Sequence, residues 1–166
     1  MNKNTASPLE DILQYQNYQI IKLFSRKKKI PIEEAEFLFV ELKKWLWFLG
    51  QRDESKGPFP MFPEQSIIDE FWHEFILSTK DYEFFCATLI GRFIHHIPTP
   101  DGVTEDDLSY GVHADLINKD EEKYVLEKSR LLKSSMLEVA DSLGVETIDL
   151  WYRQLPRKYY FPEFGK

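Results

Sequence analysis

The chain has 166 residues, of which 43% are hydrophobic and 15% aromatic, so it is long enough for one domain with a core rich in aromatic side chains. Its net charge of -7 disfavours nucleic-acid binding, because proteins that hold phosphate backbones use an excess of Lys and Arg. A single cysteine, an N-terminus without an apolar leader and the lack of an apolar run long enough to span a bilayer predict a cytoplasmic protein without disulfide bonds.

Two helices are predicted in the N-terminal third of the chain. The Ser-Pro-x-Glu sequence that begins at Ser7 is typical of a helix start, and apolar residues then recur at helical spacing as far as about Lys28. Pro31 begins a second helix, which we expect to run to about Leu49 with Gly50 directly after its end. This second helix is apolar around much of its circumference, which predicts that it is the central helix of the core.

A helical hairpin is predicted after a proline-rich loop over residues 51–65. Ser66 can cap the first arm, in which apolar residues recur every three or four positions. A new start near Thr79 begins the second arm. We expect this second helix to continue to about His96, because Pro98 disfavours helical backbone in the residue before it.

The remaining chain is predicted as a second long loop, a long helix and an aromatic tail. The loop spans residues 97–118 and contains His113 and many Asp and Glu side chains, which do not match the pattern of a calcium-binding EF-hand. A helix is expected over residues 119–143, ended by Gly144. The tail over residues 155–164 is expected either to pack on the body or to contact a partner protein.

These elements predict an all-α fold, a single-domain helical bundle of about five or six helices with two long loops. The domain covers residues 1–166, because no linker, repeat or low-complexity segment separates a second one. Residues 1–6 and 165–166 are expected to be flexible ends.

The candidate chemical groups lie in the hairpin. Asp69 and His73 are four residues apart and therefore share one face of the first arm. Cys86 and His96 are ten residues apart, about 15 Å along an unbroken helix, so both can reach one metal ion only if the helix breaks, and Gly91 is the obvious place. Two groupings follow: Asp69 and His73, with or without Cys86, or Asp69 with His96 across the mouth of the hairpin.

Several hairpin residues also occur together in a known signature. In chain order they are Asp69, Trp72, His73, Tyr82, Cys86, Gly91 and His96. Over about residues 60–98 this order resembles the glycine-rich domain-containing protein-like family, and His96 matches the family histidine better than His95 does. Many members have Trp-His-x-His, whereas Phe75 stands here at the second histidine. The resemblance implies a helical domain and brings no assigned activity with it.

Two functional hypotheses follow from these residues. In the main one the chain is a protein-interaction module, in which Asp69, Trp72, His73 and His96 form a buried hydrogen-bonded network and acidic and aromatic surfaces bind another protein. Tyr82 and His95 are further candidates for this network or for a pocket beside it.

The alternative hypothesis is a metal-binding protein, with zinc or iron, that is open to catalysis. Asp69, His73 and His96 would supply the ligands, with Cys86 in reserve, since zinc accepts all three residue types. A third idea, a Cys86 nucleophile with His73 as its base, is disfavoured because the neighbouring Phe84 and Phe85 predict burial of the thiol. No nucleotide-binding or serine-hydrolase motif is present, and the sequence leaves the identity of any small-molecule ligand open.

Overall fold

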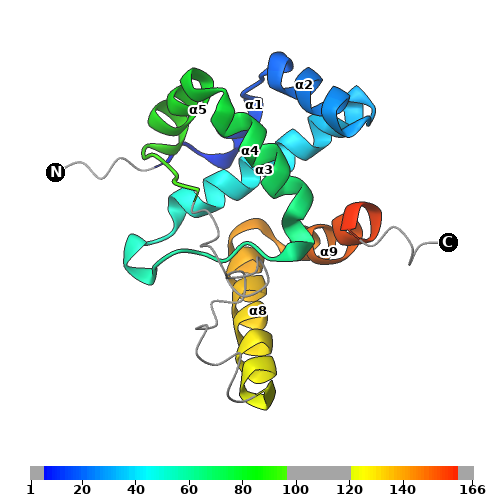
Figure 1. The fold of residues 1–166 in the computed structure, drawn as a ribbon. Coiled ribbons are helices and arrows are strands. Elements are labelled where there is room, and N and C mark those ends of the chain that lie inside the picture. The colour runs from blue at the N-terminus through cyan, green and yellow to red at the C-terminus, as the bar shows by residue number, and fades with distance from the viewer. Residues whose placement is uncertain (1–5, 97–120, 161–166) are drawn as a thin grey trace. The chain divides into compact units, whose positions relative to one another are not determined.

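The structure, a computed structural model, describes residues 6–96 and 121–160 (Figure 1). Within these ranges every regular element is a helix, which confirms the all-α prediction. The chain forms two compact units, one of Met1–Lys56 with Ile67–His95 and one of Gly57–Ser66 with His96–Lys166. The single-domain organisation stays a prediction. No helix in the described ranges is long and apolar enough to cross a bilayer.

The first unit is built around one long helix. Its helices are α1 (Leu9–Gln14), α2 (Tyr18–Lys28), α3 (Ile32–Gln51), α4 (Ser66–Leu77) and α5 (Thr79–Phe85), followed by a π-helical turn, η3 (Cys86–Ile90). Helix α3 buries residues along most of its length, as predicted for a central helix. Aromatic side chains fill the core around it: the rings of Phe24 and Phe71 are stacked with centroids 3.9 Å apart, and Phe39 meets Phe75 edge to face at 5.5 Å.

The prediction of one helix from Ser7 to Lys28 is wrong, because α1 ends at Gln14 and α2 begins at Tyr18. The Asn17 side chain caps α2 by accepting a hydrogen bond from the backbone N–H of Ile20 at 3.2 Å. Its amide nitrogen also donates to Asp81 at 2.9 Å. The break therefore brings a contact with α5 that local helical spacing does not reveal.

Lys43, on the central helix α3, stabilises the break between α1 and α2. Its side chain is fully buried, and its Nζ donates to the backbone carbonyls of Leu13 and Tyr15 at 2.6 and 2.7 Å. These carbonyls lie at the end of α1, where helix carbonyls lack partners within the helix. Burial withdraws the ammonium from water and lowers the pKa of Lys43 to about 8.

Gly50 does not follow the end of α3 but lies inside it, so the predicted end near Leu49 is early by a few residues. A Cβ atom at Gly50 would stand 2.6 Å from Cγ2 of Ile90, a distance that real Cβ atoms do not adopt. Glycine is needed here for close packing against η3. The carbonyls of Leu49 and Arg52 at the end of α3 accept hydrogen bonds from Arg92 Nη2 at 2.6 and 3.1 Å.

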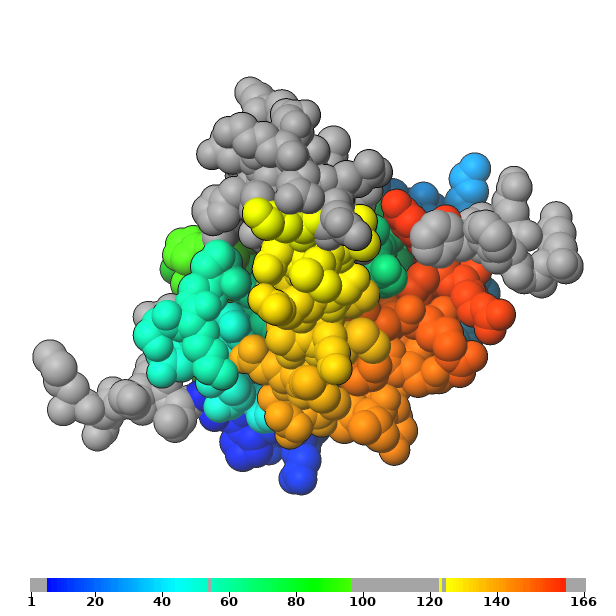
Figure 2. All heavy atoms as spheres, turned by 90° about the horizontal axis from the view of Figure 1, so that it is seen from below, coloured from blue at the N-terminus to red at the C-terminus, as the bar shows by residue number. Residues whose placement is uncertain are grey.

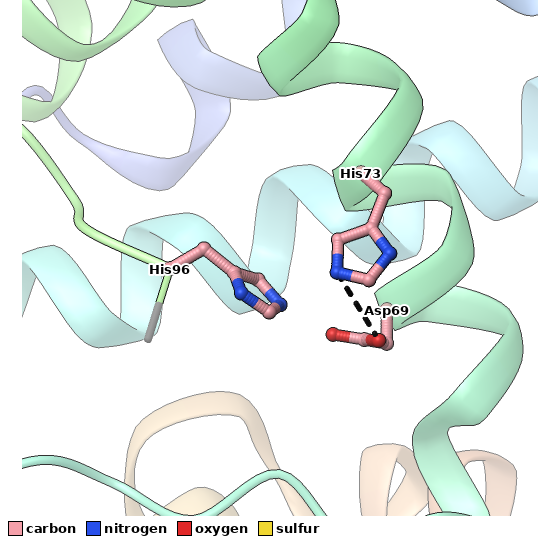
Figure 3. A group of neighbouring side chains, drawn as sticks. All are labelled: Asp69, His73 and His96. Carbon is pink, nitrogen blue, oxygen red and sulfur yellow. Dashed lines mark ion pairs between the residues drawn. The ribbon is translucent and has the colours of Figure 1, made fainter. Parts of the chain in front are cut away.

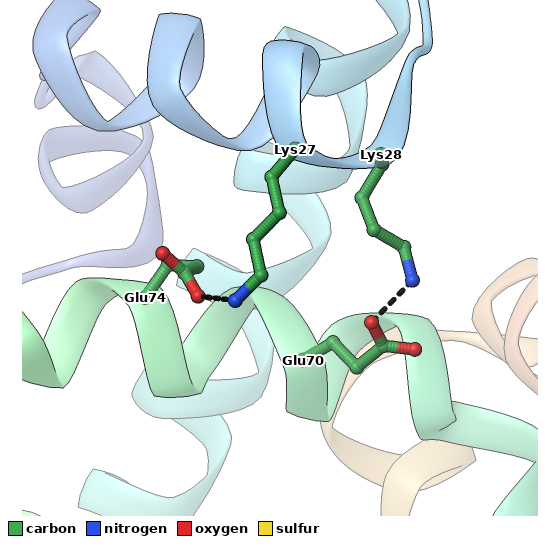
Figure 4. Close-up of polar contacts among 4 residues, drawn as sticks. All are labelled: Lys27, Lys28, Glu70 and Glu74. Atoms are coloured by element: carbon green, nitrogen blue, oxygen red, sulfur yellow. Dashed lines mark hydrogen bonds and ion pairs between the residues drawn. The ribbon is translucent and has the colours of Figure 1, made fainter.

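Helices α2 and α4 are joined by two ion pairs (Figure 4). Lys27 pairs with Glu74, which is buried, and Lys28 pairs with Glu70. The basic run at the end of α2, which complements the helix dipole, thus also neutralises two carboxylates of α4. The adjacent Lys29 ends α2 in the left-handed conformation with φ of 56°.

The second unit contains a short 3₁₀ turn, η2 (Pro63–Gln65), the long helix α8 (Glu121–Leu143), α9 (Val145–Asp149) and two π-helical turns, η4 (Leu150–Gln154) and η5 (Pro156–Tyr160). Figure 2 shows α8 beside α9 and the turns that follow it. Phe62 is buried against Leu131, Leu132 and Tyr152. The predicted end of α8 at Gly144, with φ of 89°, is confirmed. The predicted loop at residues 97–118, with His113, lies outside the described residues, as does Phe164.

The cap predicted at Ser66 is wrong, since Ser66 itself has helical backbone angles. The helical path begins at η2, where the Gln65 side chain accepts a hydrogen bond from the backbone N–H of Phe62 at 2.9 Å. This replaces the hydroxyl cap expected from the local pattern. Similarly, α1 has Pro8 rather than Ser7 as N-cap, and the Ser7 N–H instead donates to the Leu89 carbonyl at 2.8 Å.

The buried ammonium of Lys43 predicts a specific pH dependence of stability. The folded chain releases this proton near pH 8, whereas the unfolded chain holds it to the ordinary value of 10.5. Between these values the unfolded state binds more protons, so unfolding becomes harder as pH rises, by up to about 1.4 kcal/mol per pH unit. Urea unfolding of the wild type and of Lys43→Met should be compared from roughly pH 7 to roughly pH 10. The difference between their free energies of unfolding should shift in favour of the wild type above pH 8. A constant difference would mean that the two carbonyl contacts hold the charge in place.

Candidate metal centre

Helix α4 presents Asp69 and His73 one turn apart. The distance from His73 Nε2 to Asp69 Oδ2 is 3.6 Å, and the two side chains are 52% and 25% exposed respectively. The predicted sharing of one helical face is therefore seen directly. The His73 side chain is thus exposed and that of Asp69 half-buried, so water reaches both groups.

His96 lies close to Asp69 and His73 because the second helix of the hairpin ends earlier than predicted. The prediction that the helix continues to about His96 is wrong: helical structure ends at Ile90, and Gly91 adopts φ of 82°. This left-handed conformation suits glycine, and the Gly91 N–H donates to the Cys86 carbonyl at 2.9 Å. The helix thus breaks at the one position where the sequence permits it.

A buried series of hydrogen bonds holds the irregular segment that leads to His96 in place. The Trp72 Nε1–H donates to the Tyr82 hydroxyl at 3.0 Å, and the Tyr82 hydroxyl donates to the carbonyl of Ile94 at 2.6 Å. Ile94 is itself buried, and burial raises the pKa of Tyr82, which keeps its phenol protonated as a donor. His96 follows two residues after this anchor.

Asp69, His73 and His96 form a group that could hold a metal ion. Each offers one ligand atom, and these atoms all lie within 4.8 Å of one another. Figure 3 shows the carboxylate and the two imidazole rings directed toward the same space. Zinc bonds of about 2.0–2.1 Å in tetrahedral geometry place neighbouring ligand atoms about 3.3 Å apart. The 3.6 Å between His73 Nε2 and Asp69 Oδ2 is close to this value, and the separations within the whole group do not exceed 4.8 Å.

The structure therefore joins two groupings that the spacing left as alternatives. Asp69 with His73, and Asp69 with His96, belong to one group. Cys86 is not a member of it. The Cys86 thiol is fully buried beside the Tyr82 hydroxyl, and burial raises its pKa, which disfavours a thiolate ligand or nucleophile.

The other predicted residues of the network or pocket separate into buried and exposed positions. Trp72 and Tyr82 are buried, whereas His95 is exposed with its ring centroid 4.9 Å from that of Phe93. The buried polar chain consists of Trp72, Tyr82 and the Ile94 carbonyl, while His73 is about half exposed. The histidines thus lie outside the part of the network that is withdrawn from water.

Arg92 is a positioning residue that the sequence reasoning missed. Its two hydrogen bonds to the end of α3 hold the first turn of chain after Gly91, two residues before Ile94. The available signal was Gly91 itself, since a helix that ends there frees the next residues to contact other elements. The ion pairs of Glu70 and Glu74 with α2 were missed as well.

A family model described as UCP032817-like matches residues 8–129, which is more than half of the chain. The protein is a member of the UCP032817-like family. The matched range contains Asp69, His73 and His96, so this candidate metal-binding group lies within the part of the chain that the family model covers. No curated protein and no solved structure matches this chain.

Two substitutions distinguish structural from exposed residues in this region. Tyr82→Phe removes the link between Trp72 and the Ile94 carbonyl, and should lower the free energy of unfolding by about 1–3 kcal/mol, because buried polar groups lose a partner. His73→Ala, at an exposed position, should change it by less than about 1 kcal/mol. Chemical denaturation followed by circular dichroism measures both. A large loss in the His73 variant of metal-free protein would instead support a structural role for the histidine.

Proposed function

We propose that this protein binds a divalent transition-metal ion through Asp69, His73 and His96. One observation carries the proposal: three side chains from two separate stretches of the hairpin supply ligand atoms within 4.8 Å of one another. Two imidazoles and one carboxylate are ligands that zinc accepts, and three protein ligands leave a coordination position open.

The ligand types favour zinc or iron over calcium or magnesium. Calcium and magnesium prefer oxygen ligands, whereas two histidines supply nitrogen. Two histidines and one carboxylate with open positions are also an arrangement that holds non-haem Fe(II). A bound ion would supply Lewis acidity to a water or substrate at its open position. Enzymatic activity is the finer part of this proposal and depends on that open position.

The resemblance to the glycine-rich domain-containing protein-like family belongs to the same proposal. Asp69, His73 and His96 all occur in the signature that carries this resemblance. The exposed position of His73, beside the half-buried Asp69, supports a role in ligand binding rather than in packing. We also propose the cytoplasm as the location of this protein.

Metal titration of chelator-treated protein tests the proposal. Isothermal titration calorimetry with Zn²⁺, and the visible spectrum after Co²⁺ substitution, should show one ion per chain. Asp69→Asn, His73→Ala and His96→Ala should each weaken binding by at least about tenfold, because each removes one of three ligands.

Two neighbouring substitutions serve as matched controls for this titration. Glu70→Gln removes the adjacent carboxylate of α4, and His95→Ala removes the adjacent histidine, yet neither residue belongs to the group. Both variants should bind as the wild type does. Equal losses in the His95 and His96 variants, or no binding by folded wild-type protein, would refute the proposed site.

A partner protein is the second candidate function, and the aromatic tail favours it. Tyr160 at the end of η5 is 45% exposed, whereas Leu155 and Pro156 in the same segment are buried. Aromatic residues are enriched at protein–protein interfaces, and here the buried residues of the segment hold the exposed Tyr160 ring in place. Tyr159→Ala with Tyr160→Ala should reduce recovery of bound proteins in a pull-down without loss of stability; an unchanged set of bound proteins would count against this function.

A further inference from the structure

A cavity of about 390 Å³ lies in the first unit, apart from the metal group. Gln16, from the connection between α1 and α2, and Tyr18, the first residue of α2, form one wall. Glu33, Phe37 and Val40 of α3 form the other, at spacings of four and three that place them on one stripe of the helix. Its volume is that of a site for a small organic molecule.

Two carboxylates without partners among the described residues give the lining of this cavity negative charge. Glu33 and Glu36 both line it, and among the described residues neither has an ion-pair or hydrogen-bond partner. Lys43 is the one cation among the lining residues described. Its ammonium is buried and bonded to the Leu13 and Tyr15 carbonyls, so it is directed into the protein rather than toward a ligand.

Two of the residues that line the cavity, Tyr18 and Phe37, have exposed aromatic rings. Tyr18 is 59% exposed and Phe37 is 43% exposed, large fractions for aromatic side chains that line a cavity. A ligand that covers these rings would remove apolar surface from water. The faces of such rings also attract organic cations, which shed water more easily than metal ions do.

The ligand chemistry follows from the combination of acids and rings. An anion would be repelled by Glu33 and Glu36, and a neutral apolar molecule would cover their carboxylates without offering them a partner. A hydrated metal ion would gain nothing from Tyr18 and Phe37. An alkylated ammonium satisfies both features, since its charge meets the carboxylates and its methyl groups meet the rings.

We propose that the cavity beside α3 is a binding site for a small organic ammonium ion, held between the carboxylates of Glu33 and Glu36 and the rings of Tyr18 and Phe37. The site is independent of the metal group. The same chemistry is carried by a free amine and by a lysine side chain, and the open rim formed by Tyr18 admits either source.

Choline and its neutral isostere 3,3-dimethylbutan-1-ol separate charge from shape. In a ¹⁵N–¹H NMR titration with chelator present, choline should shift the amide signals of residues 33–40 and saturate. The isostere should bind at least about tenfold more weakly, because it lacks the charge that meets the acids. Lysine amide is the probe for the side-chain source, and the tighter of the two cations assigns that source.

A matched pair of variants locates the binding. Phe37→Ala and Glu36→Gln should each weaken choline binding by about 2- to 30-fold, the range for losing a cation–π contact or its electrostatic partner. Glu83→Gln and Phe84→Ala are the controls, since this adjacent acid and exposed ring lie on α5 and do not line the cavity. The dispersion of the NMR spectrum shows whether each variant is folded.

Three outcomes would overturn the proposal. Equal affinity for choline and the neutral alcohol would make the cavity a merely apolar one. The absence of saturable shifts for both cations would remove the site. Equal losses in the α3 and α5 variants would show that the cations respond only to the overall negative charge of the protein. None of these outcomes depends on metal binding by Asp69, His73 and His96.

Discussion

The geometry of the candidate metal-binding group formed by Asp69, His73 and His96 depends on the hydrogen bond from the Tyr82 hydroxyl to the Ile94 carbonyl. His96 is separated from this anchor by a single residue, and the hydrogen bonds of Arg92 to the end of α3 hold the same extended segment two residues earlier. Gly91 makes the contact possible, since its left-handed backbone ends the helix and lets the chain turn back. Burial of the phenol makes the bond strong, because water cannot compete for the carbonyl.

The charged side chains of α4 fall into two sets, those paired with lysines of α2 and those reached by water. On α4, the carboxylates of Glu70 and Glu74 are each paired with a lysine of α2, so they contribute to holding the two helices together. Asp69 and His73, on the neighbouring face of the same helix, stay accessible to water. One helix thus supplies both the attachment to the core and the candidate ligands, and this attachment limits how far the ligands can move.

Side chains satisfy backbone carbonyls at three places where the first unit departs from regular helix. Lys43 donates hydrogen bonds to carbonyls at the end of α1, and Arg92 donates to those at the end of α3. Tyr82 donates to the carbonyl of Ile94. In each case a long side chain from one element satisfies backbone groups of another. The same solution lets the chain break between α1 and α2, and that break supplies one wall of the cavity beside α3.

The all-α fold, the central position of α3, the end of α8 at Gly144 and the shared face of Asp69 and His73 followed from the sequence alone. These features depend on local spacing and on which residues tolerate a helix start or end, and such information lies within a few neighbouring positions. The tertiary structure decided the break at Asn17, the place of Gly50 inside α3 and the union of His96 with Asp69 and His73. Each of these depends on a partner distant in the chain, Asp81, Ile90 and Tyr82 respectively, and local spacing contains no information about which distant groups will meet.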